Sequence, residues 1–411
     1  MIKIKNKRDC CGCEACVQAC PKHCIDFVSD SQGFGYPRVN ENMCVNCGVC
    51  NKVCPILNVD EYSLPKTTPA YATYNKSDEQ RKTSSSGGIF TLLASNVIGK
   101  EGVVFGATFD NDWNVVHNYA DKVELIEPLK RSKYVQSRIG ESYKQVKAFL
   151  AKGKQVMFVG TPCQIAGLKH YLRKDYDNLL TVDVVCHGVP SPMIWQKYLM
   201  EKKVEIASTH HDVSPKDVDF TSISFRDKVN SWRRYHLSFT YKVRKDGIEA
   251  IGTDSIVETS SQYVWENDYM LSFLYDYANR PSCFECKFRN GKSRSDLTLA
   301  DFWNIEECMS VPEMIGEKGT SLVLVNSSRG ERLFNEIECM KENVPFEKAI
   351  AGNPAIKYDW LKPLGHDPFF LWNKKDTIHD SLVKAMRLTA QFGKIYSYYQ
   401  RFNKKMRKWQ K

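Results

Sequence analysis

One cysteine pattern occurs twice within the first 55 residues of the chain. The first copy comprises four cysteines and a proline, namely Cys10, Cys13, Cys16, Cys20 and Pro21. The second copy has the same spacing and begins 34 residues later, with Cys44, Cys47, Cys50, Cys54 and Pro55. Three closely spaced thiolates can wrap one corner of an iron–sulfur cube, whereas the fourth, held before a proline, points towards a neighbouring cube. The pattern therefore predicts a first domain that is held together by metal–sulfur clusters instead of a large apolar core.

This spacing, C-x2-C-x2-C-x3-C-P, is that of bacterial ferredoxins, in which the fourth cysteine of each run ligates the other cluster. We therefore assign one [4Fe–4S] cluster to Cys10, Cys13, Cys16 and Cys54, and a second to Cys44, Cys47, Cys50 and Cys20. Zinc sites usually close a tetrahedron from two C-x2-C units, so they fit two four-cysteine runs poorly. Disulfides would require an exported chain. Cys11 and Cys24 fall outside the pattern, and we expect them to be free thiols or packing residues.

The composition is that of a soluble globular protein with room for two to three domains. Of its 411 residues, 42% are hydrophobic and 26% are charged. No stretch approaches the ~18 apolar residues of a membrane span, and no apolar run of a secretory signal follows the charged start. Sixteen cysteines indicate a reducing compartment and metal sites. We therefore expect a cytoplasmic protein.

The net charge of +10 raises the question of nucleic-acid binding. Much of the excess lies in the C-terminal tail, at Arg401, Lys404, Lys405, Arg407, Lys408 and Lys411. The chain contains no recognised nucleic-acid-binding motif, so we expect no nucleic-acid partner. A basic face for an acidic electron-carrier protein or for a phosphorylated substrate is an alternative, as are solvated lysines on a frayed tail.

After a polar linker at residues 59–69, the chain takes on the pattern of a mixed α/β domain. Residues 83–88 predict a loop whose hydroxyl groups cap a helix that starts at Ile89. We predict strands at 102–109, 113–119, 155–159, 179–185, 296–303 and 321–326, and helices at 143–150, 164–172 and 268–277. Successive strand–helix units favour a parallel sheet with the chemistry at the carboxyl ends of its strands. Residues 220–243 predict a hairpin or small sheet, and the last 35 or so residues predict a helix on the surface.

A second set of cysteines occurs where strand-end loops or turns are predicted, at Cys163, Cys186, Cys283 and Cys286. Cys163 follows a proline at a helix start, where the helix dipole favours a thiolate. One interpretation is that the four thiols converge on a third [4Fe–4S] cluster. A zinc site and a role as small buried hydrophobes are the alternatives.

Several segments of the chain, taken in order, resemble a known family. They are 86–88 (SGG), 133–137 (KYVQS), 160–164 (GTPCQ), 186–188 (CHG), the C-x2-C at 283–286 and 296–303 (DLTLADFW). As a set they resemble the beta subunit of the coenzyme F420 (deazaflavin) hydrogenase/dehydrogenase family, over roughly residues 70–310 and with a ferredoxin domain fused in front. The part of the chain past Asn326 has no counterpart that we can match.

The resemblance implies FAD and a third [4Fe–4S] cluster, the latter with Cys163, Cys186, Cys283 and Cys286 as ligands. It also implies FAD contacts at Ser86, Gly87, Gly88, Lys133, Tyr134, Gln136, Ser137, Gly160 and Thr161. Glycines at a helix N-terminus allow backbone N–H groups to approach a pyrophosphate, which agrees with this assignment; an ordinary capped loop is the alternative. His187 and Lys133 are candidates for proton delivery, and for His187 a structural hydrogen bond is the alternative.

Together these observations predict an α+β chain: a ferredoxin-like 2[4Fe–4S] domain, then a mixed α/β flavin-binding domain with an additional small β region. The predicted divisions are 1–58 (ferredoxin), 59–69 (linker), 70–155 (FAD-binding part), 156–326 (the part with the third cluster) and 327–411 (extension with a basic aromatic tail). We expect an oxidoreductase that passes electrons between its clusters and FAD to reduce or oxidise a small organic substrate. An electron-relay subunit without its own substrate is the alternative. The expected partners are a soluble electron carrier such as ferredoxin and a small molecule, for example one used in polysaccharide biosynthesis.

Overall fold

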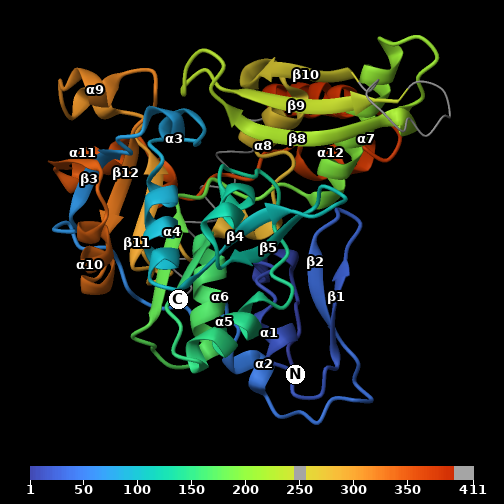
Figure 1. The fold of residues 1–411 in the computed structure, drawn as a ribbon. Coiled ribbons are helices and arrows are strands. Elements are labelled where there is room, and N and C mark those ends of the chain that lie inside the picture. Colours follow the sequence, from blue (N-terminus) through green and yellow to red (C-terminus); the bar gives the residue numbers. More distant parts are fainter. Residues whose placement is uncertain (245–255, 393–411) are drawn as a thin grey trace.

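The computed structural model describes residues 1–244 and 256–392. The N-terminal module has two similar halves (Figure 1). Each half carries a one-turn helix within its cysteine run, α1 (Ala15–Gln18) and α2 (Val49–Lys52). Between them, β1 (Ile25–Ser29) pairs antiparallel with β2 (Gly35–Val39). The prediction of a ferredoxin-like domain is confirmed by this arrangement.

The main domain is built on one eight-stranded sheet of order β13-β3-β12-β11-β7-β6-β4-β5. Its strands are β3 (Ala70–Tyr74), β4 (Val103–Phe109), β5 (Val115–Ala120), β6 (Val156–Gly160), β7 (Leu179–Val184), β11 (Leu297–Asp301), β12 (Ser321–Val325) and β13 (Met340–Val344). The central strands β4, β6, β7 and β11 run parallel, as the successive strand–helix units predict. Their carboxyl ends therefore open at one edge, where ligands bind in sheets of this kind.

Helices cover both faces of this sheet. Helix α4 (Ile89–Gly99) and helix α10 (Ser328–Glu336) pack on one face, and α5 (Ser142–Ala151) and α6 (Pro162–Leu172) pack on the other. The side chains of β6 alternate accordingly: Met157 and Val159 face α4, whereas Val156 and Phe158 face α5 and α6. Helices α3 (Asp78–Lys82), α9 (Pro312–Ile315) and α11 (Phe346–Ala351) lie around the β3 side of the sheet.

The additional β region is a three-stranded antiparallel sheet of β8 (Val218–Asp227), β9 (His236–Val243) and β10 (Ile256–Tyr263). Helices α7 (Pro192–Ser208), α8 (Asp268–Leu274) and α12 (His366–Trp372) pack against it in an aromatic core (Figure 1). The helical residues 378–392 join this core through Ile378, Leu382 and Ala385, which are buried. The expectation of a surface helix is therefore wrong for this part of the tail, and the basic residues from Arg401 onward lie outside the described residues.

The expectation that a hydroxyl group caps the helix at Ile89 is wrong. Helix α4 begins after Gly88, whose φ of +83° is left-handed, and no hydroxyl caps it. The hydroxyl groups of Ser84 and Ser86 instead donate to the carbonyl oxygens of Gln80 and Thr320.

The main sheet contains strands from all three predicted stretches 70–155, 156–326 and 327–411, because β13 comes from the last of them. None of the described helices is long and apolar enough to cross a membrane.

Candidate functional site

The cysteines of the two N-terminal runs surround two separate small cavities. One cavity is lined by Cys10, Cys13, Cys16 and Cys54, together with Cys11. The other is lined by Cys44, Cys47, Cys50 and Cys20, together with Cys24. Each cavity therefore takes three thiols from one copy of the pattern and the fourth from the other copy. This donor set of four sulfurs around a common space fits a [4Fe–4S] cluster in each half.

The four later cysteines also line one cavity, although they come from three separate segments of the chain. Cys163 lies in the first turn of α6 and Cys186 follows β7, while Cys283 and Cys286 lie in and after the short 3₁₀ helix Pro281–Glu285. Burial, and then the negative charges of Cys283, Cys163 and Cys286, raise the pKa of Cys186 well above its usual value. Burial likewise raises the pKa of Cys283 to about 12. A group that neutralises several thiolates at once fits this cavity.

Among residues 1–244 and 256–392, no group of three or more histidine, cysteine, aspartate or glutamate side chains is arranged to hold one metal ion.

Cys163 lies at a helix start, as predicted, although α6 begins at Pro162, two residues before the predicted start. Thr161 forms a capping box with Gln164, in which the Gln164 Oε1 accepts from the Thr161 backbone N–H at 2.9 Å. A hydrogen bond with the Cys11 thiol, followed by burial, raises the pKa of Cys163 well above its usual value. The contribution of the helix dipole to this thiol stays a prediction.

Beside these cysteines lies a much larger cavity of about 700 Å³, at the carboxyl ends of the parallel strands. Seven of the nine residues expected to contact FAD line it, namely Ser86, Gly88, Lys133, Tyr134, Ser137, Gly160 and Thr161. The other two expected residues, Gly87 and Gln136, are not among its lining residues and contact protein groups: Gly87 N–H donates to Ser321 Oγ, and Gln136 bonds to Cys11 and Arg280. A Cβ at Gly87 would lie 2.5 Å from the Thr73 carbonyl oxygen, so close packing is the reason for glycine there.

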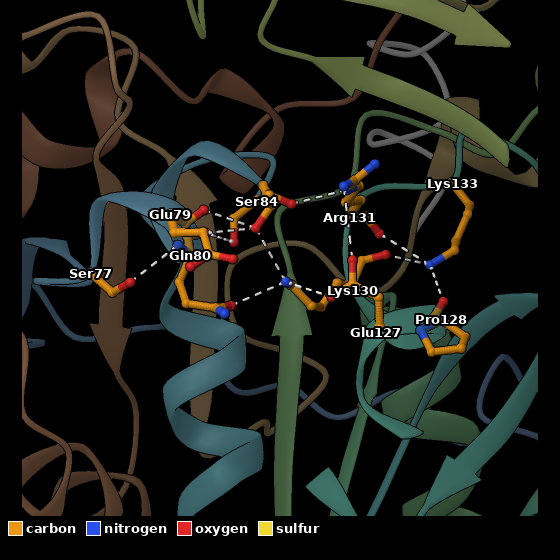
Figure 2. A network of polar contacts seen from close by, with 10 residues as sticks. Ser77, Glu79, Gln80, Ser84, Glu127, Pro128, Lys130, Arg131 and Lys133 are labelled. Carbon is orange, nitrogen blue, oxygen red and sulfur yellow. Dashed lines mark hydrogen bonds and ion pairs between the residues drawn. The ribbon is translucent and has the colours of Figure 1, made fainter. Parts of the chain in front are cut away.

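The segment that carries Lys133 is tied to the loop before α4, as Figure 2 shows. The Lys133 ammonium donates to the carbonyl oxygens of Pro128 and Lys130, at 2.8 and 2.6 Å. Lys130 donates to Gln80 and Glu127, so it joins the two loops. Burial lowers the pKa of Lys133 to about 7. The two hydrogen bonds hold the Lys133 side-chain nitrogen against backbone oxygens beside the cavity.

A second hydrogen-bonded chain supports the floor of the large cavity. Gln164 Nε2 donates to Ser137 Oγ at 2.8 Å, and Ser137 Oγ lies 3.1 Å from His117 Nδ1. His117 Nε2 lies 3.1 Å from the Val159 carbonyl oxygen, which can only accept, so Nε2 carries the proton. Burial lowers the pKa of His117 to about 4, so the imidazole is neutral. This chain fixes the backbone at Ser137 and at the end of β6.

The far end of the large cavity is cationic and aromatic. Arg226 is buried and donates to Asp301 at 2.7 Å and to the Tyr134 hydroxyl at 3.2 Å. Its Nε and the indole N–H of Trp360 have no hydrogen-bond partner within the described chain. His187, which also lines this cavity, lies 3.0 Å from Asp276 and stacks near Trp360 with ring centres 5.1 Å apart. A cavity of this volume with unpartnered polar atoms fits a ligand the size of a flavin dinucleotide.

The cavities follow one another and share walls. Cys11 and Ile56 line both the cavity of Cys10 and the cavity of the four later cysteines. Residues 184–189, which follow β7 and include Cys186 and His187, line both that cavity and the large one. The cavity of Cys10, the cavity of the four later cysteines and the large cavity are therefore adjacent, and neighbouring cavities share lining residues.

Several of these residues were missed by the sequence analysis. Cys11 and Cys24 are free and packed in apolar clusters, as expected, and each also lines a cavity with four candidate ligands, which was not foreseen. The adjacent pair Cys10-Cys11 was the available signal for the first of them. No sequence pattern marks Trp360 or Arg226 as a site residue, because their place in the cavity depends on how the C-terminal part and the small sheet pack on the main domain.

Comparisons with known proteins agree with this architecture. Residues 9–57 match the model of the 4Fe-4S dicluster domain. Residues 153–344 match the model of the C terminus of the coenzyme F420 hydrogenase/dehydrogenase beta subunit. The second match extends past Asn326, so the expectation of no counterpart beyond this residue is wrong.

Individual relatives are distant. The chain is 25% identical over 349 residues to the coenzyme F420-dependent sulfite reductase of Methanocaldococcus jannaschii, covering 82% of this chain and 47% of that protein. It is 26% identical over 199 residues to an uncharacterized protein of the same organism, covering 41% and 54%. The chain thus spans about half the length of the curated relatives it matches.

A solved chain from the F420-reducing [NiFe] hydrogenase complex of Methanosarcina barkeri aligns with a TM-score of 0.43 at 14% identity, covering 81% of this chain and 94% of that one. The two family matches, to residues 9–57 and 153–344, are the basis for the assignment. The chain therefore contains an N-terminal 4Fe-4S dicluster domain and, at residues 153–344, a domain that matches the C terminus of the coenzyme F420 hydrogenase/dehydrogenase beta subunit.

Proposed function

We propose that this protein is an iron–sulfur flavoprotein oxidoreductase with three [4Fe–4S] clusters and one FAD, which acts on a small organic substrate. The observation that carries the proposal is the sequence of cavities with shared walls, from the N-terminal thiols through Cys11 to the four later cysteines and on to the large cavity. Such a row keeps successive redox groups close together while the surrounding protein excludes water. When bound, the clusters carry single electrons and the flavin converts them to two-electron chemistry on an organic molecule.

The residues that would hold each group follow from the donor sets described above. The third cluster would be held by Cys163, Cys186, Cys283 and Cys286, which line one cavity. The flavin would lie against the 84–88 loop and the 133–137 segment, both of which contribute lining residues to the large cavity. The relative named as coenzyme F420-dependent makes a deazaflavin the other candidate, as bound group or as substrate.

For proton delivery, His187 is better placed than Lys133. His187 lines the large cavity from the segment after β7, and its Nε2 lies 3.0 Å from Asp276 but makes no hydrogen bond within the described chain, so it can bond to a ligand. The Lys133 ammonium already donates to two carbonyl oxygens, so it would have to break these bonds in order to reach a substrate. We therefore propose that His187 would supply a proton beside a bound flavin, and that Lys133 would stabilise negative charge near the loop.

The large cavity also favours a substrate of its own over a simple relay role. Its convergent polar groups, which include Arg226, His187 and the Trp360 indole N–H, are typical of a site that orients a small molecule. A soluble electron carrier such as ferredoxin remains the proposed electron donor or acceptor. A substrate from polysaccharide biosynthesis remains a hypothesis that rests on the family resemblance alone.

The test is the iron and flavin content of anaerobically purified protein and of Cys163→Ala and Cys283→Ala variants. We expect ~12 irons and one flavin per chain in the wild type, and ~8 irons in each variant. Extraction followed by absorbance and mass spectrometry distinguishes FAD from a deazaflavin.

Cys308→Ala is the matched control, because Cys308 packs in the apolar cluster beside β3 and α11 and lines none of these cavities. It should retain all of its iron. A wild-type protein with ~8 irons and no flavin would refute the proposed function, and equal iron content in the wild type and both active-site variants would refute the third cluster.

A further inference from the structure

One buried cation, Arg280, lies against the loop of the first cysteine run. Arg280 has an exposed fraction of 0% and precedes Cys283 by only three positions. Its guanidinium donates from Nε to the Cys10 carbonyl oxygen at 2.8 Å and from Nη2 to the Gly35 carbonyl oxygen at 2.9 Å. Its Nη1 donates to Gln136 Oε1 at 2.9 Å. The side chain thus joins the N-terminal module to the main domain at the loop that carries the first cluster ligands.

This guanidinium has only neutral hydrogen-bond acceptors and no carboxylate partner in the described parts of the chain. A buried charge is costly unless an opposite charge lies nearby. Arg226, the comparable buried arginine of the large cavity, meets this requirement through its ion pair with Asp301 at 2.7 Å. Arg280 has no such ion pair in the described chain, and the rings of Tyr36 and Phe34 lie 4.4 and 5.4 Å from its guanidinium carbon.

Candidate cluster ligands lie close to this guanidinium. It donates to the carbonyl oxygen of Cys10, the first ligand of its run, and Arg280 precedes Cys283 by three positions. A cluster held by four thiolates would bring negative charge to each of these places and would supply the counter-charge.

The backbone around Arg280 is built to keep the guanidinium in this place. Gly12 has a φ of +74°, and a Cβ there would lie 2.4 Å from Gln136 Nε2 and 3.0 Å from Arg280 Nη1. Gln136 in turn donates from Nε2 to the Cys11 carbonyl oxygen at 3.2 Å. The Arg280 backbone N–H donates to the Val189 carbonyl oxygen at 3.0 Å. The glycine between Cys11 and Cys13 therefore lets the amide and the guanidinium pack directly under the ligand loop.

We propose that Arg280 is the shared counter-charge of two clusters, the one held by Cys10, Cys13, Cys16 and Cys54 and the one held by Cys163, Cys186, Cys283 and Cys286. This inference rests on the proposed function for the second of these clusters. A fixed positive charge favours the more negative, reduced form of a nearby cluster, so Arg280 raises the reduction potentials of both. The cluster of the Cys44 run, which the Arg280 side chain does not contact, is affected least. Arg280 is thus a positioning residue that tunes electron affinity and does not touch the substrate.

The experiment is a redox titration of the full-length holoprotein under anaerobic conditions, followed by electron paramagnetic resonance after the iron content has been measured. In Arg280→Gln, we expect at least a tenfold loss of electron affinity at the first and third clusters, which corresponds to about 59 mV per tenfold for one electron. Arg280→Lys keeps the charge and should stay close to the wild type. Gln136→Glu places a carboxylate beside the unchanged arginine and should shift the same two clusters in the same direction.

Arg81→Gln is the matched control, because it removes a buried guanidinium that donates to the carbonyl oxygens of Gly319 and Glu313, away from the cysteine cavities. It should leave all potentials unchanged. If Arg280→Gln loses its iron, Gln136→Glu decides the question. The proposal is wrong if the iron-loaded Arg280→Gln variant has the same reduction potentials as the wild type. If Arg280→Gln does not retain its iron, the proposal is wrong when Gln136→Glu has the potentials of the wild type. Two clusters in the wild type would overturn the third-cluster assignment, while the shift of the first cluster would still test Arg280.

Discussion

Helix α6 contains a glycine at the point where the N-terminal module meets the main domain, and its replacement tests how tightly the two are docked. A Cβ at Gly167 would lie 2.8 Å from Cys13 Cβ, 2.8 Å from the Tyr143 hydroxyl oxygen and 3.1 Å from Cys13 Sγ. The Tyr143 hydroxyl donates to the Gln164 carbonyl oxygen at 2.7 Å, and Cys13 belongs to the ligand loop. Neither neighbour can retreat without breaking these interactions.

Two opposing effects decide the outcome of Gly167→Ala. Alanine in a helix interior is favoured over glycine by ~1 kcal/mol. Overpacking of a well-filled interior costs about 1–3 kcal/mol, and contacts of 2.8 Å with two fixed groups belong at the upper end of that range. We therefore expect a net loss of up to ~2 kcal/mol in the free energy of unfolding. Because Cys13 is displaced, iron content should fall as well.

The assay is thermal unfolding of the anaerobic protein by circular dichroism, together with iron content. Gly99→Ala is the matched control: Gly99 ends helix α4, and nothing lies within 4 Å of the position that its Cβ would take. This control should unfold at the same temperature as the wild type or slightly above it. If Gly167→Ala also unfolds at or above the wild-type temperature and keeps its iron, this result contradicts the inference that α6 packs closely on the ligand loop.

Three further predictions concern the supports of the site. The pKa of His117 is about 4 in the folded chain, against 6.5 ordinarily. As the pH falls, the unfolded chain therefore binds the proton before the folded chain does. The free energy of unfolding is highest above pH 6.5 and decreases by about 3 kcal/mol as the pH falls towards 4. His117→Gln should flatten this dependence in urea unfolding measured at pH 7 and pH 5, whereas an unchanged slope would contradict the burial of a neutral imidazole. Glu14→Gln removes the negative charge that pairs with Arg138 and the oxygen that accepts from Arg138 Nη2 at 3.3 Å, which should cost ~1–2 kcal/mol in thermal unfolding, and no loss would mean that this pair does not dock the module. Ser191→Ala removes the cap of α7 and the donor to the Gln32 carbonyl oxygen, which should cost about 1–2 kcal/mol in the same assay, and a wild-type midpoint would exclude that cap as a support.

The sequence predicts most of the parts that have local signals. The doubled cysteine run specifies which thiols share a cavity, because ligand spacing and chain crossover are set within 55 residues. The alternation of strands and helices from 102 to 185 predicts β4 to β7 closely, since these strands are short apolar runs flanked by helices. The edge strand β13 gives no such signal, because its sequence MKENV has four exposed residues in a row.

The long-range parts of the site are harder to predict. Cys163 and Cys186 follow neighbouring parallel strands, so their proximity can be expected from topology. Cys283 and Cys286 reach the same cavity because the 3₁₀ helix Pro281–Glu285 packs against the N-terminal module, which no local pattern reports. The same is true of Arg280, whose partners Cys10 and Gln136 lie 270 and 144 residues away.

The two cysteine runs have the same spacing, but the fold gives them different surroundings. The first run packs on α6, Gln136 and Arg280, and Cys13 is buried. The second run faces solvent: Cys47 is exposed, and the apolar side chains of Met43 and Val45 in its loop are 51% and 58% exposed. A cluster whose ligand loop is exposed can approach an external carrier, whereas the buried one can communicate only with the interior. Within the proposed function, an electron carrier therefore exchanges electrons first with the cluster of Cys44, Cys47, Cys50 and Cys20, and the run that contacts Arg280 provides the connection inward.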